Sequence, residues 1–191
     1  MQHKNLKQQI SSFAYFSNDE LELIVSKFIP HSFKAKAFLQ KQNRVCSAIH
    51  FISEGLVRNY YVRNDKEITT YLACDNSFIS AYASFITQTN SAENIQCIEA
   101  TKTLSISHTH MQELYRDVPN WQIIGRILAE KNYICMADRI LKLQAVPAKD
   151  KYLDFLSTSS TKIIQRTPQI YIASFLGITP ESLSRIRKSI S

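Results

Sequence analysis

The spacing of apolar residues changes along the chain and divides it into regions of different predicted structure. The first signal is a helix start, because Ser17 can cap a helix and Glu20, three residues later, can complete a capping box. Phe16 and Leu21 are placed to form the hydrophobic staple of the same helix. We expect this helix to end before Pro30, because the residue before a proline avoids helical conformations.

Between residues 33 and 107 the apolar period shortens to two, which is typical of β-strands. The predicted strands cover residues 33–39, 48–53, 56–62, 67–73 and 95–107. Gly55 lies where the chain must turn between the second and the third of them, a position that favours glycine. Short antiparallel strands without helices between them indicate a jelly roll or a barrel.

After Pro119 the apolar residues recur at the spacings of a helix. This pattern predicts a helix of about 24 residues that ends before Pro147. A helix of this length forms either a dimer seam or a packing surface for its own chain, and the pattern alone leaves both open. A second helix is expected at residues 148–156, followed by a polar connector at residues 157–161.

The segment 169–188 meets the steric requirements of a helix-turn-helix. Ala173 supplies the small residue needed where two helices cross, and Gly177 supplies the positive φ of the turn four residues later. Thr179 is a good N-cap, and Pro180 fits the first position of the second helix. An amphipathic hairpin with a solvated charged face is the alternative, but it does not account for the Ala–Gly spacing together with the cap.

The outward face of the second predicted helix carries groups that suit DNA. We expect Leu183, Ile186 and Ile190 to face the core, which turns the charged side chains outward. An arginine on this face can donate two hydrogen bonds to a guanine, and a glutamate can accept one from a cytosine amino group. The candidate base-reading residues are Glu181, Ser182 and Arg185. The candidate phosphate contacts are Thr179, Arg187 and Lys188.

The net charge of +7 is unevenly distributed along the chain. Residues 1–118 hold 12 Lys/Arg and 11 Asp/Glu, whereas residues 119–191 hold 11 Lys/Arg and 5 Asp/Glu. A basic C-terminal part attached to a nearly neutral one indicates a polyanionic partner, with nucleic acid ahead of membrane. The chain has no apolar run of bilayer length and no signal-peptide pattern, so we expect a cytoplasmic protein without a membrane partner.

Residues 168–188 resemble the DNA-binding helices of the catabolite activator/fumarate-nitrate regulator (Crp/Fnr) family, with the sequence PQIYIASFLGITPESLSRIRK. Residues 152–156, YLDFL, are similar to the helix that precedes them in that family. The resemblance implies an α+β protein with an antiparallel, jelly-roll-like β-roll, a long dimerisation helix and a C-terminal winged helix-turn-helix. The implied domains are a cyclic-nucleotide-binding-like sensor at residues 1–118, the dimerisation helix at 119–146 and a DNA-binding domain at 147–191.

The same resemblance implies a transcriptional regulator that binds double-stranded DNA as a homodimer, with RNA polymerase as a further candidate partner. It places Glu181 and Arg185 at base-reading positions of the second helix. Pro180 stands where some members have arginine, which leaves the preferred half-site open. Because the chain ends at Ser191, we expect the hairpin wing to be missing or minimal.

The sensor resembles its relatives less than the DNA-binding helices do. In cyclic-nucleotide-binding members, a Phe-Gly-Glu segment holds the ribose and an Arg-x-Ala segment pairs with the cyclic phosphate. Here the glycine, the glutamate and the arginine are absent, and the corresponding residues are Phe78, Ser80, Ser91, Ala92 and Glu93. An acidic side chain would repel a phosphate, so we expect an effector other than cyclic AMP or cyclic GMP. Aromatic residues that could line a pocket or belong to the core are Tyr60, Tyr61, Tyr71 and Tyr82.

We expect no cofactor, no metal and no catalytic residue in this chain. The four cysteines are scattered and include no CxxC pair. His108 and His110 would share one face of a strand but lack a third ligand close in sequence. One alternative is a cupin-like metal enzyme fused to a basic tail, with His50 and Glu54 as its nearest approach to a ligand pair. Another is an interaction module that retains the fold without binding DNA.

Overall fold

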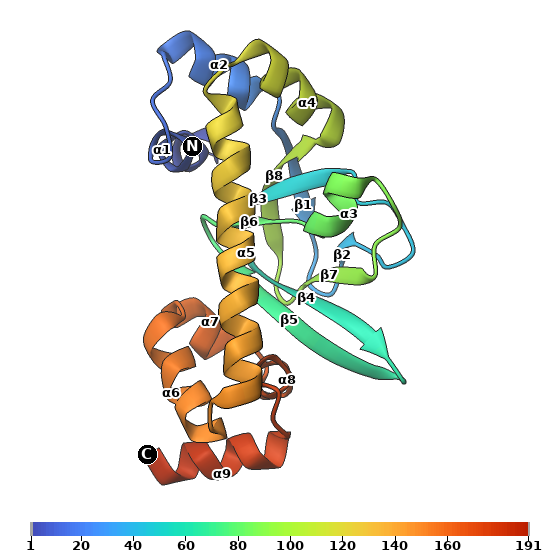
Figure 1. Ribbon diagram of the computed structural model, residues 1–191, viewed down its shortest axis with the longest axis vertical. Helices are drawn as coiled ribbons and strands as arrows, with labels where there is room; N and C mark the ends of the chain where they lie inside the picture. The colour runs from blue at the N-terminus through green and yellow to red at the C-terminus, as the bar shows by residue number, and fades with distance from the viewer. Residues whose placement is uncertain (1, 191) are drawn as a thin grey trace.

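A long helix connects the two parts of the molecule in the computed structural model, which describes residues 2–190 (Figure 1). Helix α5 (Trp121–Ala145) runs from an N-terminal β-roll to a group of helices at the C-terminal end. The predicted order of a β-roll, a long helix and a helical C-terminal unit is therefore confirmed. Within residues 2–190, none of the helices combines the length and the apolar character that a bilayer span requires.

The roll consists of two four-stranded antiparallel sheets. One sheet has the order β1 (Ile29–Phe33), β8 (Thr101–Ser107), β3 (Ala48–Glu54) and β6 (Phe78–Ile79). The other has the order β2 (Phe38–Gln40), β7 (Glu93–Cys97), β4 (Leu56–Arg63) and β5 (Lys66–Cys74). The inward faces enclose a core that includes Ile49, Phe51, Ile95, Leu104 and Ile106. Burial of this apolar surface holds the two sheets together.

Two of the predicted strands are wrong because the chain changes sheet inside them. In the first, β1 ends at Phe33, Lys36 adopts a positive φ of 67°, and β2 begins only at Phe38. In the second, residues 95–107 divide between β7 and β8, which belong to opposite sheets. A change of sheet requires a break in strand pairing, and the imperfect alternation in this stretch is the local sign of that break.

Four helices accompany the roll: α1 (Gln2–Ser11), α2 (Asn18–Ser26), α3 (Tyr82–Thr87) and α4 (His108–Asp117). The predicted capping box of α2 is confirmed, because the Ser17 hydroxyl accepts from the Glu20 amide and the Glu20 carboxylate accepts from the Ser17 amide. His108 and His110 follow the end of β8 and do not share the face of a strand. Ser107 caps α4 by accepting from the His110 amide at 3.1 Å, so both histidines lie in the first turn of a helix.

Helix α5 has two halves with different surroundings. Trp121, Ile124 and Gly125 in its first half are buried, and both Trp121 and Ile124 belong to the core of the roll. In its second half, large apolar side chains face outward, namely Tyr133, Ile134, Met136, Ile140, Leu141 and Leu143. The first half therefore packs against its own chain, whereas the second half leaves an apolar surface uncovered.

The C-terminal unit contains α6 (Ala148–Thr158), α7 (Thr161–Arg166), α8 (Gln169–Leu176) and α9 (Pro180–Ile190). Helix α6 was predicted, but the expected connector at residues 157–161 is wrong for most of its length, because α6 continues to Thr158 and α7 begins at Thr161. The unit has its own apolar cluster, which includes Tyr152, Phe155, Ile172, Ala173, Leu176 and Leu183. Leu72 of β5 joins the same cluster, so the unit packs against the roll.

Candidate nucleic-acid interface and cavity

Helices α8 and α9 and the turn between them form the helix-turn-helix that the sequence predicts. Ala173 is fully buried where they cross, and no larger side chain would let the backbones approach as closely. Gly177 ends α8 with φ 66° and ψ 34°, the left-handed conformation that a side chain disfavours. The Thr179 hydroxyl then accepts from the Ser182 amide at 3.2 Å and caps α9.

The outer face of α9 is polar and basic. Leu183 is buried and Ile186 is half-buried, so these two residues fix the inner face. Ile190 is exposed, which differs from its expected inward position. The proposed DNA-contacting side chains lie at the surface: Thr179, Glu181, Arg185, Arg187 and Lys188 are exposed, and Ser182 is half-buried. The described residues end with α9, so the expectation that a hairpin wing is missing or minimal falls outside them.

The N-terminal end of α9 holds a negative charge in a defined environment. The pKa of Glu181 is lowered, first by a hydrogen bond from its own amide and then by the Thr179 hydroxyl. Arg185 lies one turn further along and donates weakly to the Ser182 hydroxyl at 3.4 Å. An acceptor and a guanidinium donor are therefore both exposed on this face of α9, and groups of these two kinds can pair with base edges.

One residue of the roll clamps the first helix of the motif. The Arg58 side chain is almost fully buried, and its guanidinium carbon lies 3.6 Å from the ring centroid of Tyr171 in α8 and 4.1 Å from that of Tyr60. It also donates to Glu67 at 2.6 Å and to Gln96 at 2.8 Å. Because Arg58 and Tyr171 belong to different parts of the chain, this contact joins β4 of the roll to α8.

Hydrogen bonds between side chains and backbone groups hold α8 against the β4–β5 hairpin at a second point. The Ser174 hydroxyl accepts from the Thr69 amide at 2.9 Å and donates to the Glu67 carbonyl at 3.1 Å. Arg139 of α5 donates to the Phe175 carbonyl at 2.8 Å and to the Thr69 carbonyl at 2.9 Å. The roll, the long helix and α8 therefore meet at one junction.

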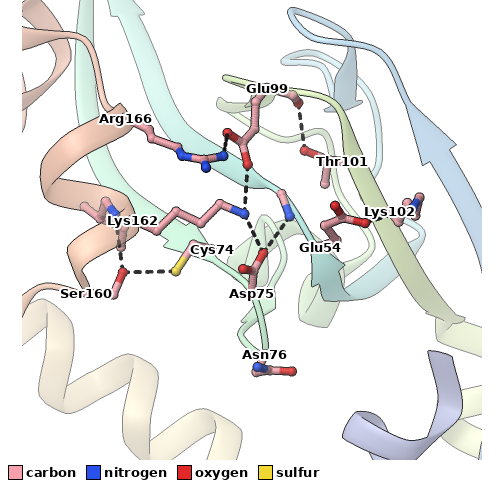
Figure 2. A network of polar contacts seen from close by, with 12 residues as sticks. Glu54, Cys74, Asp75, Asn76, Glu99, Thr101, Lys102, Ser160, Lys162 and Arg166 are labelled. Atoms are coloured by element: carbon pink, nitrogen blue, oxygen red, sulfur yellow. Dashed lines mark hydrogen bonds and ion pairs between the residues drawn. The ribbon is translucent and has the colours of Figure 1, made fainter. Parts of the chain in front are cut away.

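A network of ion pairs holds α7 on the roll (Figure 2). Lys162 donates to Asp75 and to Glu99, each at 2.8 Å, and Arg166 donates to Glu99 at 3.1 Å. Asp75 also accepts from the Gly55 amide at 2.7 Å. Burial acts to lower the pKa of Lys162, but its hydrogen bonds with the two carboxylates outweigh this effect and raise it. The network fixes the position of α7 with charges that salt screens only in part.

A cavity of about 450 Å³ lies between the roll, α1 and α5. Its wall includes three of the five residues predicted for the sensor, namely Phe78, Ser80 and Glu93. Ser91 and Ala92 are not part of the wall: Ser91 is buried with its hydroxyl on the Glu93 amide, and Ala92 is exposed. Of the four tyrosines, Tyr61, Tyr71 and Tyr82 line the cavity, whereas Tyr60 packs on Arg58.

The carboxylate of Glu93 is positioned by two neutral donors of β4. Asn59 donates to one oxygen at 2.9 Å and the Tyr61 hydroxyl donates to the other at 2.7 Å. Burial and the hydrogen bond to Glu93 raise the pKa of Tyr61, so its phenol stays protonated as a donor. Sequence reasoning did not pair these residues, although two consecutive polar side chains in a buried strand, Arg58 and Asn59, were a signal that it could have used.

The structure also gives each candidate metal ligand a different partner. His50 is buried with its Nδ1 2.7 Å from the Ser105 hydroxyl, and burial followed by the nearby His31 lowers its pKa to about 4. Glu54 is exposed and pairs with Lys102. Over residues 2–190, no three His, Cys, Asp or Glu side chains gather as a metal-binding group would require.

Comparisons with known proteins show which solved structures share this arrangement of elements. No protein-family model matches the chain, and neither does any curated protein. Among solved structures, FixK2 from Bradyrhizobium japonicum has a TM-score of 0.76 at 12% identity, covering 85% of this chain and 84% of its own. The c-di-GMP-responsive global regulator CLP from Xanthomonas campestris has a TM-score of 0.72 at 14% identity and covers 91% of each chain.

A regulator from Eubacterium rectale, described as a member of the Crp/Fnr family, has a TM-score of 0.69 at 18% identity, covering 91% of this chain and 83% of its own. The identities are low, so these likenesses concern the fold. They extend over the roll, the long helix and the C-terminal helices together. The chain therefore has the fold of the Crp/Fnr transcriptional regulators, with an N-terminal β-roll of the cyclic-nucleotide-binding type and a C-terminal helical domain.

Proposed function

We propose that this chain is a sequence-specific DNA-binding transcriptional regulator that acts as a homodimer and carries a degenerate cyclic-nucleotide-type sensor. The observation that carries the proposal is the α8–α9 turn, in which a buried alanine, a left-handed glycine and a capped second helix present a polar, basic face. A helix of this geometry fits the major groove. Because the proposed partner is chromosomal DNA, we also propose that the protein acts in the cytoplasm and that it is not an enzyme.

In this proposal, residues 147–191 bind DNA, residues 119–146 join the dimer and residues 1–118 form the sensor. Glu181, Ser182 and Arg185 read bases, whereas Thr179, Arg187 and Lys188 contact phosphates. The uncovered apolar surface of α5 supports the homodimer, because a symmetric reader needs two recognition helices about 34–36 Å apart. RNA polymerase is a further partner that we propose for the DNA-bound dimer.

The test begins with DNA selected from random duplexes by the purified protein, which supplies a specific site. On that site, Arg185→Ala is expected to lower the binding free energy by about 1–3 kcal/mol, because it removes a bidentate base contact. On random DNA, the same substitution is expected to change the binding free energy little. Lys188→Ala is expected to weaken binding to both DNAs alike and to make the dependence of log affinity on log salt concentration shallower by about one unit. Titrations of both DNAs at several salt concentrations measure both effects.

The two substitutions serve as controls for each other, because each removes one exposed cation from the same helix. If Arg185→Ala lost equal affinity on both DNAs, Arg185 would contact phosphate and the proposed position of α9 in the groove would be wrong. If the wild-type protein selected no sequence and bound DNA without dependence on salt, the chain would be an interaction module and the proposal as a whole would fail.

Cyclic AMP is not expected to bind with micromolar affinity. In the proposed alignment, Glu93 lies where cyclic-nucleotide-binding members have their phosphate-binding Arg-x-Ala segment. Asn59 and Tyr61 hold its carboxylate in the cavity wall. A cyclic phosphate would meet this negative charge in place of an arginine. Calorimetric titration of the full chain measures the affinity, and saturable micromolar binding would contradict the degenerate sensor.

A further inference from the structure

The carboxylate of Glu93 has no counter-ion among the described residues. Its two hydrogen bonds come from a neutral amide and a neutral phenol, and it forms none of the ion pairs found in residues 2–190. A carboxylate offers about four acceptor positions, and these donors use two of them. Glu93 therefore keeps acceptor capacity at the cavity wall, whose described lining also includes one basic side chain, Lys131.

The remainder of the wall suits the body of an organic cation. Aromatic rings of Phe13, Tyr61, Tyr71, Phe78 and Tyr82 line the cavity. Ring faces attract ammonium and guanidinium groups. Lys131 also lines the cavity, and its ammonium lies 4.2 Å from the ring centroid of Phe13, so that ring already holds a cation. The Glu93 carboxylate and the other four rings form the part of the wall that suits an amine.

The size of the cavity argues against a lone inorganic ion. A volume of about 450 Å³ falls within the range of small-molecule sites, which spans roughly 300–1,000 Å³. A metal ion would find one carboxylate and no second acidic or histidine ligand in this wall. An occupant that fills the space needs an apolar or aromatic body attached to the cationic group.

We propose that the cavity binds a small organic amine, whose cationic nitrogen pairs with the Glu93 carboxylate and whose apolar body lies among the aromatic side chains. Tyr61 and Asn59 are positioning residues in this site, because they hold the carboxylate in place and carry no charge of their own. The inference rests on the sensor role in the proposed function and specifies the class of its effector.

The experiment uses three probes with the same ring and spacer but different charge: 2-phenylethylamine, 2-phenylethanol and 3-phenylpropionate. Binding to the full chain is measured without DNA, by ligand-observed NMR and calorimetry at millimolar concentration. The amine is expected to bind at least about tenfold more tightly than the acid, with the alcohol between them. Glu93→Gln is expected to weaken the amine about tenfold and to leave the alcohol nearly unchanged.

Two further variants serve as controls. Tyr61→Phe keeps the ring and removes only the hydroxyl donor that positions the carboxylate, so it is expected to weaken the amine less than Glu93→Gln does. Glu54→Gln removes a carboxylate that is exposed and paired with Lys102, and it is expected to change no probe affinity. Because both variants keep the charge of Glu93, they separate its effect from a general loss of fold.

The proposal is overturned if the amine shows no saturable binding, if the acid binds as tightly as the amine, or if Glu93→Gln leaves the amine affinity unchanged. DNA selection on the same preparation distinguishes this failure from failure of the proposed function. A protein that selects DNA but binds no amine would refute only the ligand class. A protein that binds the amine but no DNA would refute the regulator and leave the site in place.

Discussion

Replacing Leu183 by alanine is expected to lower the free energy of unfolding of the C-terminal unit by about 2–5 kcal/mol. Leu183 is 1% exposed and belongs to the apolar cluster that holds α9 on α8 and α6. Removing its side chain leaves a cavity that a short helix anchored by few buried residues cannot close. Urea denaturation followed by circular dichroism measures the loss, and DNA binding should fall in parallel.

The matched control is Ile170→Ala in α8, because Ile170 is 60% exposed and contributes little buried area. Its effect is expected to stay within about 0.5 kcal/mol, as is usual for exposed positions. An equal loss of stability in the two variants would contradict the packing described for the helix-turn-helix. Wild-type affinity for DNA in a destabilised Leu183→Ala protein would show that α9 does not need this anchor to read DNA.

The second large effect concerns the apolar surface of α5. A double substitution, Ile140→Glu and Leu141→Glu, is expected to weaken dimerisation by at least about 100-fold, because a dimer seam would have to bury unpaired carboxylates. Both residues are exposed in the single chain, so its fold is expected to tolerate the change. Sedimentation equilibrium across a range of protein concentrations measures the dissociation constant.

Lys149→Gln in α6 is the control for this experiment. Like each of the two glutamate substitutions, it changes the net charge by one unit, and it lies at an exposed position outside α5. It is expected to leave the dimer intact. A wild-type chain that sediments as a monomer with and without DNA would contradict the homodimer, and a double variant that remains dimeric would place the seam elsewhere.

The local features of the sequence were sufficient to predict the turn between α8 and α9. Gly177, Thr179 and Pro180 each impose a backbone preference on their own position, so their order predicts a turn and a helix start without reference to the remainder of the chain. The length of α5 was equally local, because an uninterrupted helical period and Pro147 define its extent. These elements agree with the structure to within a few residues.

Features that depend on distant contacts could not be predicted in this way. Helix α7 is short, and its position rests on ion pairs to Asp75 and Glu99, which lie far away in sequence. The charged side chain of Arg58 was not expected to be buried, because the Tyr171 ring that covers it belongs to another part of the chain. The pairing of Glu93 with β4 was missed for the same reason.

The two faces of β4 have a consequence for how such a protein can evolve. Side chains alternate along a strand, and in β4 Asn59 and Tyr61 point to the carboxylate in the cavity, whereas Arg58 and Tyr60 point to α8. Mutations at Asn59 and Tyr61 can therefore alter the cavity while the attachment of α8 stays under separate selection. Neighbouring codons in one short stretch of the gene thus encode two traits that can diverge independently among descendants.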